Sequence, residues 1–255
     1  MGRFQDCRKP SEGFQCGLVS GLTQTIVFNT YDRALYHSIV NNRAFLNREN
    51  WRGNPLRGVS PSFLQRAFSA GLYFPLEDLF RTTISTNYAV AGVLVGLVGG
   101  LFTTPFNCVK YSIWSSRPGD GKPTMYAVAS KLVREGGPAR LMRGAAPTLY
   151  RDMTFGVTYS FLRHQGDNGF AVNVCAAFVA TAISSPLNYA RMKVYSGEPG
   201  PKGTWEIIKT LVRETGQSEE KAIPFLFRRL NVGWGALRVS LGMGIGSQIY
   251  KTCCE

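Results

Sequence analysis

Uncharged runs alternate with basic segments along this chain. Residues 89–109 and residues 170–190 each form a run of 21 residues without a charged side chain. About 20 apolar residues cross the hydrocarbon core of a bilayer as a helix. A third run, residues 13–31, is weaker because glutamine and asparagine interrupt it. The pattern predicts membrane-spanning helices, because runs of this length are uncommon among the core helices of soluble proteins.

The long runs lead into shorter amphipathic stretches. After a helix expected at residues 88–115, apolar residues stand at helical spacing from 125 to 134, as in a helix lying on a surface. Glycines 136 and 137 end this stretch. The same order returns in the last third, with helices expected at residues 172–194, 205–213 and 231–251. Glycines at four-residue spacing (Gly92, Gly96 and Gly100) predict close helix packing.

A short motif ends the uncharged run in the middle third of the chain and again in the last third. It has a proline, an asparagine two residues later and a base five residues after the proline: Pro105, Asn107 and Lys110, then Pro186, Asn188 and Arg191. An earlier copy at residues 30–35 keeps an acid, Asp32, and lacks both proline and base. Proline inside a helix removes a backbone hydrogen bond, so both prolines are expected helix kinks.

Aligned positions recur at nearly constant intervals. Gln65, Arg151 and Arg238 lie 86 and 87 residues apart, which predicts tandem repeats of one structural unit. We expect an all-α membrane protein of one domain, residues 1–255, with six transmembrane helices in three repeats (12–83, 86–168 and 169–255) and short surface helices. Six spans place both chain ends on one side and the basic loops on the other.

The chain carries a formal charge of +13. A basic protein can bind nucleic acid, but no helix-turn-helix, zinc-knuckle or aromatic-sheet signature is present, and periodic basic loops are typical of membrane topology. The six cysteines lack the spacing of a zinc site or a disulfide scaffold, and two histidines offer little for catalysis. We therefore expect no enzyme, no metal site and no nucleic-acid partner.

Several motifs together resemble the mitochondrial carrier family. They are the two proline motifs, Glu135-Gly136, residues 143–152, Leu56-Arg57-Gly58 and residues 73–81. The resemblance covers nearly the whole chain. It implies a barrel of three helix pairs in the mitochondrial inner membrane, with basic loops and short helices facing the matrix and both termini on the intermembrane-space side. It implies no cofactor apart from bound cardiolipin at the matrix surface, at Arg52, Gly53, Arg57, Gly58, Arg143 and Gly144.

The resemblance also implies two charge networks that close the barrel. On the matrix side the acid positions are Asp32, Asn107 and Asn188, and the base positions are Leu35, Lys110 and Arg191. By this template only Asp32 and Lys110 form a full ion pair between repeats, Asn107 hydrogen-bonds to Arg191, and Asn188 faces Leu35 without a pair. On the opposite side the family has an acid and, three residues later, a base in each repeat. Asp78 and Arg81 match this motif, whereas the second repeat has His164 and Asp167 there and the third has Lys251 and Cys254.

The three substrate contact points of the family fall at Gln65, at Arg151 with Asp152, and at Arg238. Two arginines that face a cavity suit an anionic or zwitterionic solute. The alternative is that Arg151 pairs with Asp152 or with a neighbouring helix and binds no solute.

Depleted charge pairs on both sides bear on function, because alternation needs two closed states of similar energy. The main hypothesis from the sequence is therefore a structural or accessory subunit of a larger inner-membrane assembly, such as a respiratory complex or ATP synthase. Its partners would be membrane lipid and the subunits of that complex. The alternative hypothesis is an active carrier that exchanges a small anionic or amino-acid-like metabolite.

Overall fold

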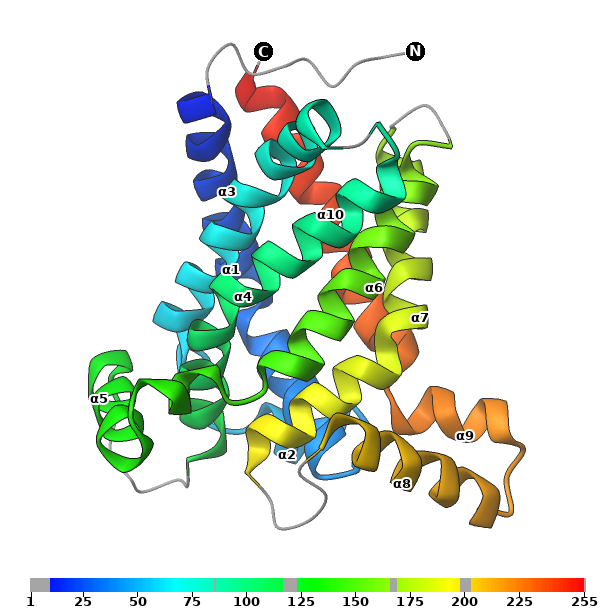
Figure 1. Cartoon of the computed structure of the whole chain (residues 1–255). Coiled ribbons are helices and arrows are strands. Elements are labelled where there is room, and N and C mark those ends of the chain that lie inside the picture. Colours follow the sequence, from blue (N-terminus) through cyan, green and yellow to red (C-terminus); the bar gives the residue numbers. More distant parts are fainter. Residues whose placement is uncertain (1–9, 85, 117–122, 166–168, 198–202, 255) are drawn as a thin grey trace.

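Six long helices form the body of the protein (Figure 1). The computed structural model describes residues 10–84, 86–116, 123–165, 169–197 and 203–254, and every regular element in these ranges is helical. The long helices are α1 (Pro10–Val40), α3 (Val59–Thr83), α4 (Tyr88–Ser115), α6 (Ala145–Arg163), α7 (Phe170–Ser196) and α10 (Val232–Cys254). The all-helical prediction is confirmed.

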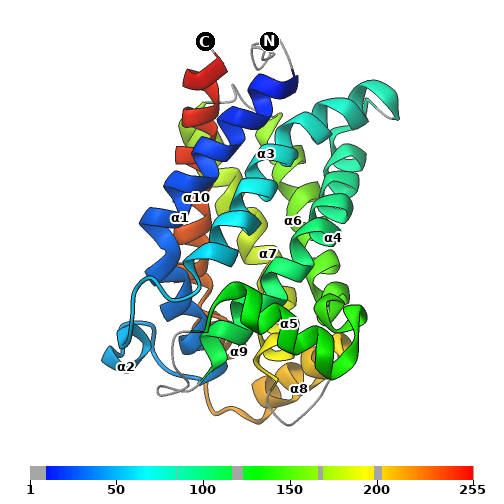
Figure 2. The ribbon, with the colours of Figure 1, turned by 90° about the vertical axis from the view of Figure 1, so that its left-hand side faces the viewer.

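The short helices gather at one end of the molecule, and α1 begins and α10 ends at the other (Figures 1 and 2). They are α2 (Arg48–Trp51), α5 (Met125–Gly136), the 3-10 helix η1 (Pro138–Met142), α8 (Thr204–Gln217) and α9 (Ala222–Arg229). The amphipathic pattern predicted α5 and α8. It missed α9, where Pro224 stands in the first turn, a position that tolerates proline.

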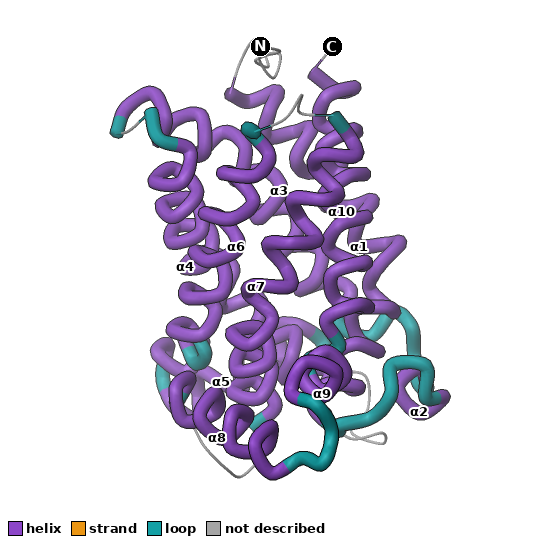
Figure 3. Tube along the Cα trace, turned by 90° about the vertical axis from the view of Figure 1, so that its right-hand side faces the viewer, coloured by secondary structure: helices purple, strands orange, loops and turns teal. Residues whose placement is uncertain are grey.

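The long helices close into a ring. Figure 3 shows α10, the last of them, beside α1, the first. Each packs against the next in the order α1, α3, α4, α6, α7 and α10, and α10 returns to α1. Two of them, α4 and α7, are long and apolar enough to cross a membrane by length and composition, in agreement with the two uncharged runs. The Asn87 side chain caps α4 by accepting from the backbone N–H of Ala89, which fixes the start of that helix.

Glycine sets the distance between α4 and α6. A Cβ atom added to Gly92 would lie 2.4 Å from the carbonyl oxygen of Gly156, and one added to Gly96 would lie 2.4 Å from that of Asp152. The predicted close packing at these glycines is confirmed, and it places the backbone of Asp152 on α6 directly against Gly96 of α4.

The helices α3, α6 and α10 each begin after a residue with positive φ. These residues are Gly58, Gly144 and Asn231, with φ of 74°, 82° and 49°, and they lie 86 and 87 residues apart. Each junction touches the end of the next helix around the ring. A Cβ on Gly58 would lie 2.5 Å from Trp114 Nε1, one on Gly144 would lie 2.8 Å from the Tyr195 ring, and Asn231 donates to Ser38 Oγ at 2.5 Å. One local geometry thus occurs three times.

A buried ion pair joins α3 to α6 near the end where α10 terminates. Arg163 Nη1 lies 3.2 Å from Glu77 Oε2, and Ser160 donates to Glu77 Oε1 at 2.7 Å. The two charged side chains are 4% and 2% exposed. Because α4 stands between α3 and α6 in the ring, this pair crosses the inside of the barrel.

We predict opposite effects for the same substitution at two glycines of α4. Gly92→Ala should lower stability by about 1–3 kcal/mol, because its methyl group meets the backbone of α6. Gly99→Ala should be neutral or stabilise by up to about 1 kcal/mol, because a Cβ there meets nothing within 4 Å and alanine favours helix. Thermal unfolding of the purified proteins in detergent measures both, and equal effects would contradict the close α4–α6 contact.

The Glu77–Arg163 pair gives a second stability prediction. Glu77→Gln should destabilise the protein by about 3–5 kcal/mol, because it leaves a buried guanidinium without its carboxylate. The matched control is Glu220→Gln, which removes an exposed pair with Arg228 and should cost less than about 1 kcal/mol. A similar small cost at both positions would show that the Glu77 carboxylate is hydrated rather than buried.

Candidate functional site

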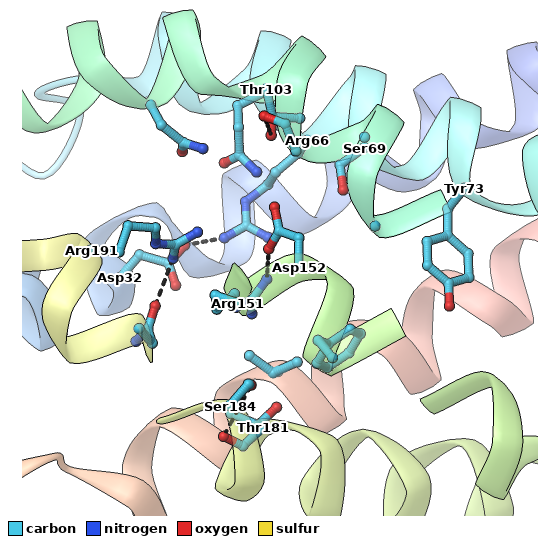
Figure 4. A pocket seen from close by; sticks show the side chains of 18 of the residues that line it. Asp32, Arg66, Ser69, Tyr73, Thr103, Arg151, Asp152, Thr181, Ser184 and Arg191 are labelled. Carbon is cyan, nitrogen blue, oxygen red and sulfur yellow. Dashed lines mark hydrogen bonds and ion pairs between the residues drawn. The ribbon is translucent and has the colours of Figure 1, made fainter. Parts of the chain in front are cut away.

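A cavity of about 220 Å³ lies between the six long helices, each of which contributes side chains to its wall. Charged side chains from different helices turn toward one another there (Figure 4). Five bases line it: Arg66, Lys110, Arg151, Arg191 and Arg238. Two acids, Asp32 and Asp152, stand against them, so the wall has a formal excess of three positive charges.

Asp32 is held by two arginines from the helices on either side of α1. Arg238 Nε donates to Asp32 Oδ1 at 2.5 Å and Arg238 Nη2 donates to Oδ2 at 3.2 Å, while Arg66 Nη2 also donates to Oδ2. The three side chains are between 8% and 15% exposed. Arg238 also lies over the Phe28 ring, 4.7 Å from its centroid. This cluster joins α1 to both α3 and α10.

Arg151 and Asp152 form a pair of their own. Arg151 Nη1 lies 2.6 Å from Asp152 Oδ1, and the guanidinium carbon lies 5.0 Å from the centroid of the Phe155 ring. Their side chains are 19% and 17% exposed. Both residues line the cavity. The two hypotheses for Arg151, pairing with Asp152 and facing a solute, are therefore compatible.

The other two bases are held by neutral amides. Lys110 Nζ donates to Gln65 Oε1 at 2.9 Å, and Arg191 Nη2 donates to Asn188 Oδ1 at 2.7 Å within α7. Lys110 also lies over the rings of Tyr111 and Trp114, at 4.9 and 5.2 Å.

The structure brings both predicted sets of residues into one cavity. The expected substrate contacts (Gln65, Arg151, Asp152 and Arg238) and the expected network positions (Asp32, Asn107, Lys110, Asn188 and Arg191) all line it. The partners differ from the template, however. Asp32 pairs with Arg66 and Arg238 instead of Lys110, and Arg191 bonds to Asn188 in its own helix instead of Asn107. Arginines on α3 and α10 therefore outcompete the lysine of α4 for the single acid of the motif.

The remaining motif residues are placed as follows. Pro105 and Pro186 lie inside the unbroken helices α4 and α7, and the kinks expected there stay a prediction. The side chain of Asp78 lies outside the described residues. Arg81 donates to the Tyr88 hydroxyl at 3.2 Å and stacks on its ring.

The residues expected to hold cardiolipin lie at the end with the short helices. Gly58 and Gly144 form the junctions before α3 and α6, and Gly53 also has positive φ. Arg57 is committed to backbone oxygens, since it donates to the carbonyls of Ile113 and Ser116, each at 3.0 Å. The carbonyl of Arg52 accepts from Arg33 at 2.9 Å, and Arg143 is half-buried. Lipid binding at these residues stays a prediction.

Sequence reasoning missed two sets of charges. Arg66 was missed because the repeat spacing points to its neighbour Gln65. A base directly beside an aligned contact position could have indicated a second cavity residue. Glu77 and Arg163 were missed because the gate template points to Asp78 and Arg81 on α3. Their spacing of 86 residues equals that of Gln65 and Arg151, which marks them as aligned positions of opposite charge.

Known proteins match parts of this chain. The family model described as mitochondrial carrier protein matches residues 83–171. The mitochondrial magnesium exporter 1 of Drosophila melanogaster is 33% identical over 173 residues, which are 60% of this chain and 56% of the exporter. A tricarboxylate transporter of Alternaria alternata is 35% identical over 101 residues, 37% of this chain and 46% of that protein. The chain thus spans about half the length of the curated relatives it matches.

These matches agree with the motifs of the sequence and with the closed ring of six helices around a central cavity. The mitochondrial carrier family model thus covers residues 83–171, and the motifs outside that range are similar to those of the same family.

Proposed function

We propose that this protein is a solute carrier of the mitochondrial inner membrane that moves a small organic anion through its central cavity. The observation that carries the proposal is the charge of the cavity wall, where five bases face two acids. Fixed positive charge in a cavity with apolar walls attracts and concentrates anions. The same charge repels a bare metal cation.

The relatives support transport more than assembly. One is named for a tricarboxylate and the other for magnesium, so their names alone leave the sign of the solute charge open. The excess of positive charge in this cavity favours the anion. Groups of three or more histidine, cysteine or acidic residues that would suit a metal ion are absent from the described part of the chain.

The membrane arrangement is part of the proposal. All six long helices cross the membrane, and the end with the short helices and basic loops faces the matrix, where anionic lipid attracts lysine and arginine. The three positive-φ junctions at 58, 144 and 231 support three tandem repeats, because one backbone geometry returns at intervals of 86 and 87 residues.

Charge pairs in the barrel supply the closures that alternating access needs. The buried Glu77–Arg163 pair links α3 to α6 at one end of the barrel. At the level of the cavity, Asp32 links α1 to α3 and α10. Each would have to break and re-form when the barrel opens on the corresponding side.

The accessory-subunit hypothesis rests on charges that lack their template partners. The structure weakens that argument, because Asp32 has two arginine partners and Arg163 has Glu77. Ion pairs outside the motif pairing are therefore present in the barrel, and the depletion of the motifs alone is not a sign of lost transport.

The proposal predicts saturable uptake of carboxylates by the purified protein in liposomes that contain anionic lipid. Arg151→Ala should lower uptake by about tenfold or more, because it removes a cation from the cavity wall and leaves the Asp152 carboxylate to repel the solute. The control is Lys131→Ala on α5, whose side chain is 75% exposed and lies outside the cavity, so uptake should be unchanged.

A panel of monocarboxylates, dicarboxylates, tricarboxylates, amino acids and Mg²⁺ identifies the solute class. Uptake of Mg²⁺ in preference to every anion would contradict the proposal. Absence of uptake, together with stoichiometric co-purification with an inner-membrane complex, would favour the accessory-subunit hypothesis.

A further inference from the structure

We propose that Lys110 and Arg191 form the carboxylate-binding pair of the cavity and that the ligand is a dicarboxylate or tricarboxylate. This inference rests on the proposed function and names the atoms that recognise the solute. Neither residue belongs to the contact points that the resemblance implies, which lie on α3, α6 and α10 at Gln65, Arg151 and Arg238.

The two acids of the cavity already have arginine partners. Asp32 accepts from Arg66 and Arg238, and Asp152 pairs with Arg151. Two carboxylates therefore take up three of the five bases. These contacts fix helices to one another and leave Lys110 and Arg191 without a carboxylate at ion-pair distance, so these two bases account for two of the three excess positive charges. Asp32 lies within electrostatic range of both.

Lys110 is a buried base with a neutral partner. Its side chain belongs to a residue that is 5% exposed, and its ammonium has one hydrogen-bond acceptor, Gln65 Oε1. Within the part of the chain that the structure describes, no carboxylate oxygen lies at ion-pair distance from it. A buried cation without an anion is costly. A ligand carboxylate would supply the missing charge and occupy two further donors of the ammonium.

Arg191 is likewise bonded to a neutral amide. Its Nη2 donates to Asn188, and its Nε is buried without a hydrogen-bond partner among the described residues. Figure 4 shows the Arg191 side chain turned toward Asp32 and Arg66 at the centre of the cavity. A guanidinium binds a carboxylate best through two parallel N–H donors, and the buried Nε of Arg191 is a donor without a partner among the described residues.

Lys110 and Arg191 line the same cavity from different helices. They stand on α4 and α7, lie within electrostatic range of one another and line the same cavity. Two cations on different helices are best neutralised by one molecule with carboxylates at both ends. A tricarboxylate would also balance the formal excess of three positive charges on the wall.

The motif sequence explains why Lys110 and Arg191 have no carboxylate partner. In each motif an asparagine replaces the acid two residues after the proline, so Asn107 and Asn188 provide amides where a carboxylate would neutralise a base. The amides of Gln65 and Asn188 hold Lys110 and Arg191 in place without cancelling their charge.

Two isosteric substitutions test this inference. Asn188→Asp places a carboxylate 2.7 Å from Arg191, and Gln65→Glu places one 2.9 Å from Lys110. Thermal unfolding of the purified protein in detergent is followed while citrate, succinate, acetate or inorganic phosphate is titrated. Each variant should require about tenfold or more citrate than the wild type for half-maximal stabilisation. Without ligand each variant should be as stable as the wild type or more stable, because the new carboxylate neutralises a buried cation.

The matched control is Gln217→Glu, which adds the same charge at the exposed end of α8, outside the cavity. It should leave the citrate dependence unchanged. Lys110→Gln, which removes the ammonium and keeps an amide contact with Gln65, should weaken citrate binding in the same way and replaces either variant that fails to fold.

The outcomes separate this inference from the proposed function. Wild-type protein that binds citrate with an affinity unchanged in Asn188→Asp, Gln65→Glu and Lys110→Gln would overturn the inference and leave the anion carrier standing. Stabilisation by phosphate that equals that by citrate would overturn the ligand class. A wild-type protein that no anion stabilises would overturn both.

Discussion

The structure depends on the Asp32 carboxylate and the two guanidinium groups that hold it. Arg66 comes from α3 and Arg238 from α10, so one acid on α1 fixes the helix that follows and the last helix of the chain. A charge inside a membrane protein is stable only beside a partner or water. Asp32 therefore both helps to close the ring and decides which of the neighbouring bases are neutralised. Lys110 and Arg191 are left with amides.

Lys110 and Arg191 lie inside the helical barrel without a carboxylate at ion-pair distance, and a buried cation without an anion costs stability. Aromatic rings beside Lys110 and amide oxygens beside both bases lower that cost without removing the charge. An anion from solution removes it when it binds. The proposed binding of a carboxylate in the cavity rests on these contacts.

Much of the fold was predictable because strong local signals agree. The helix expected at residues 88–115 has these ends in the structure, where an asparagine cap begins it, and the repeat spacing located Gln65, Arg151 and Arg238 on one cavity. The partners of the charged residues were not predictable. A motif states which residues occupy a helix and leaves open how far that helix is rotated, so Asp32 was assigned to Lys110 although two arginines reach it. Glu77 and Arg163 were overlooked for a different reason. They are aligned positions of opposite charge, and the family motif places its acid and base at other positions.

The central claim is that the cavity binds an organic anion through its excess of positive charge. Isothermal titration calorimetry on the wild-type protein, with acetate, succinate, citrate and Mg²⁺ at low and high salt, tests it most directly. The account predicts affinity that rises from acetate through succinate to citrate and falls as salt is added, with no heat of binding for Mg²⁺. Binding of Mg²⁺, or affinity that is the same for all three carboxylates, would contradict it.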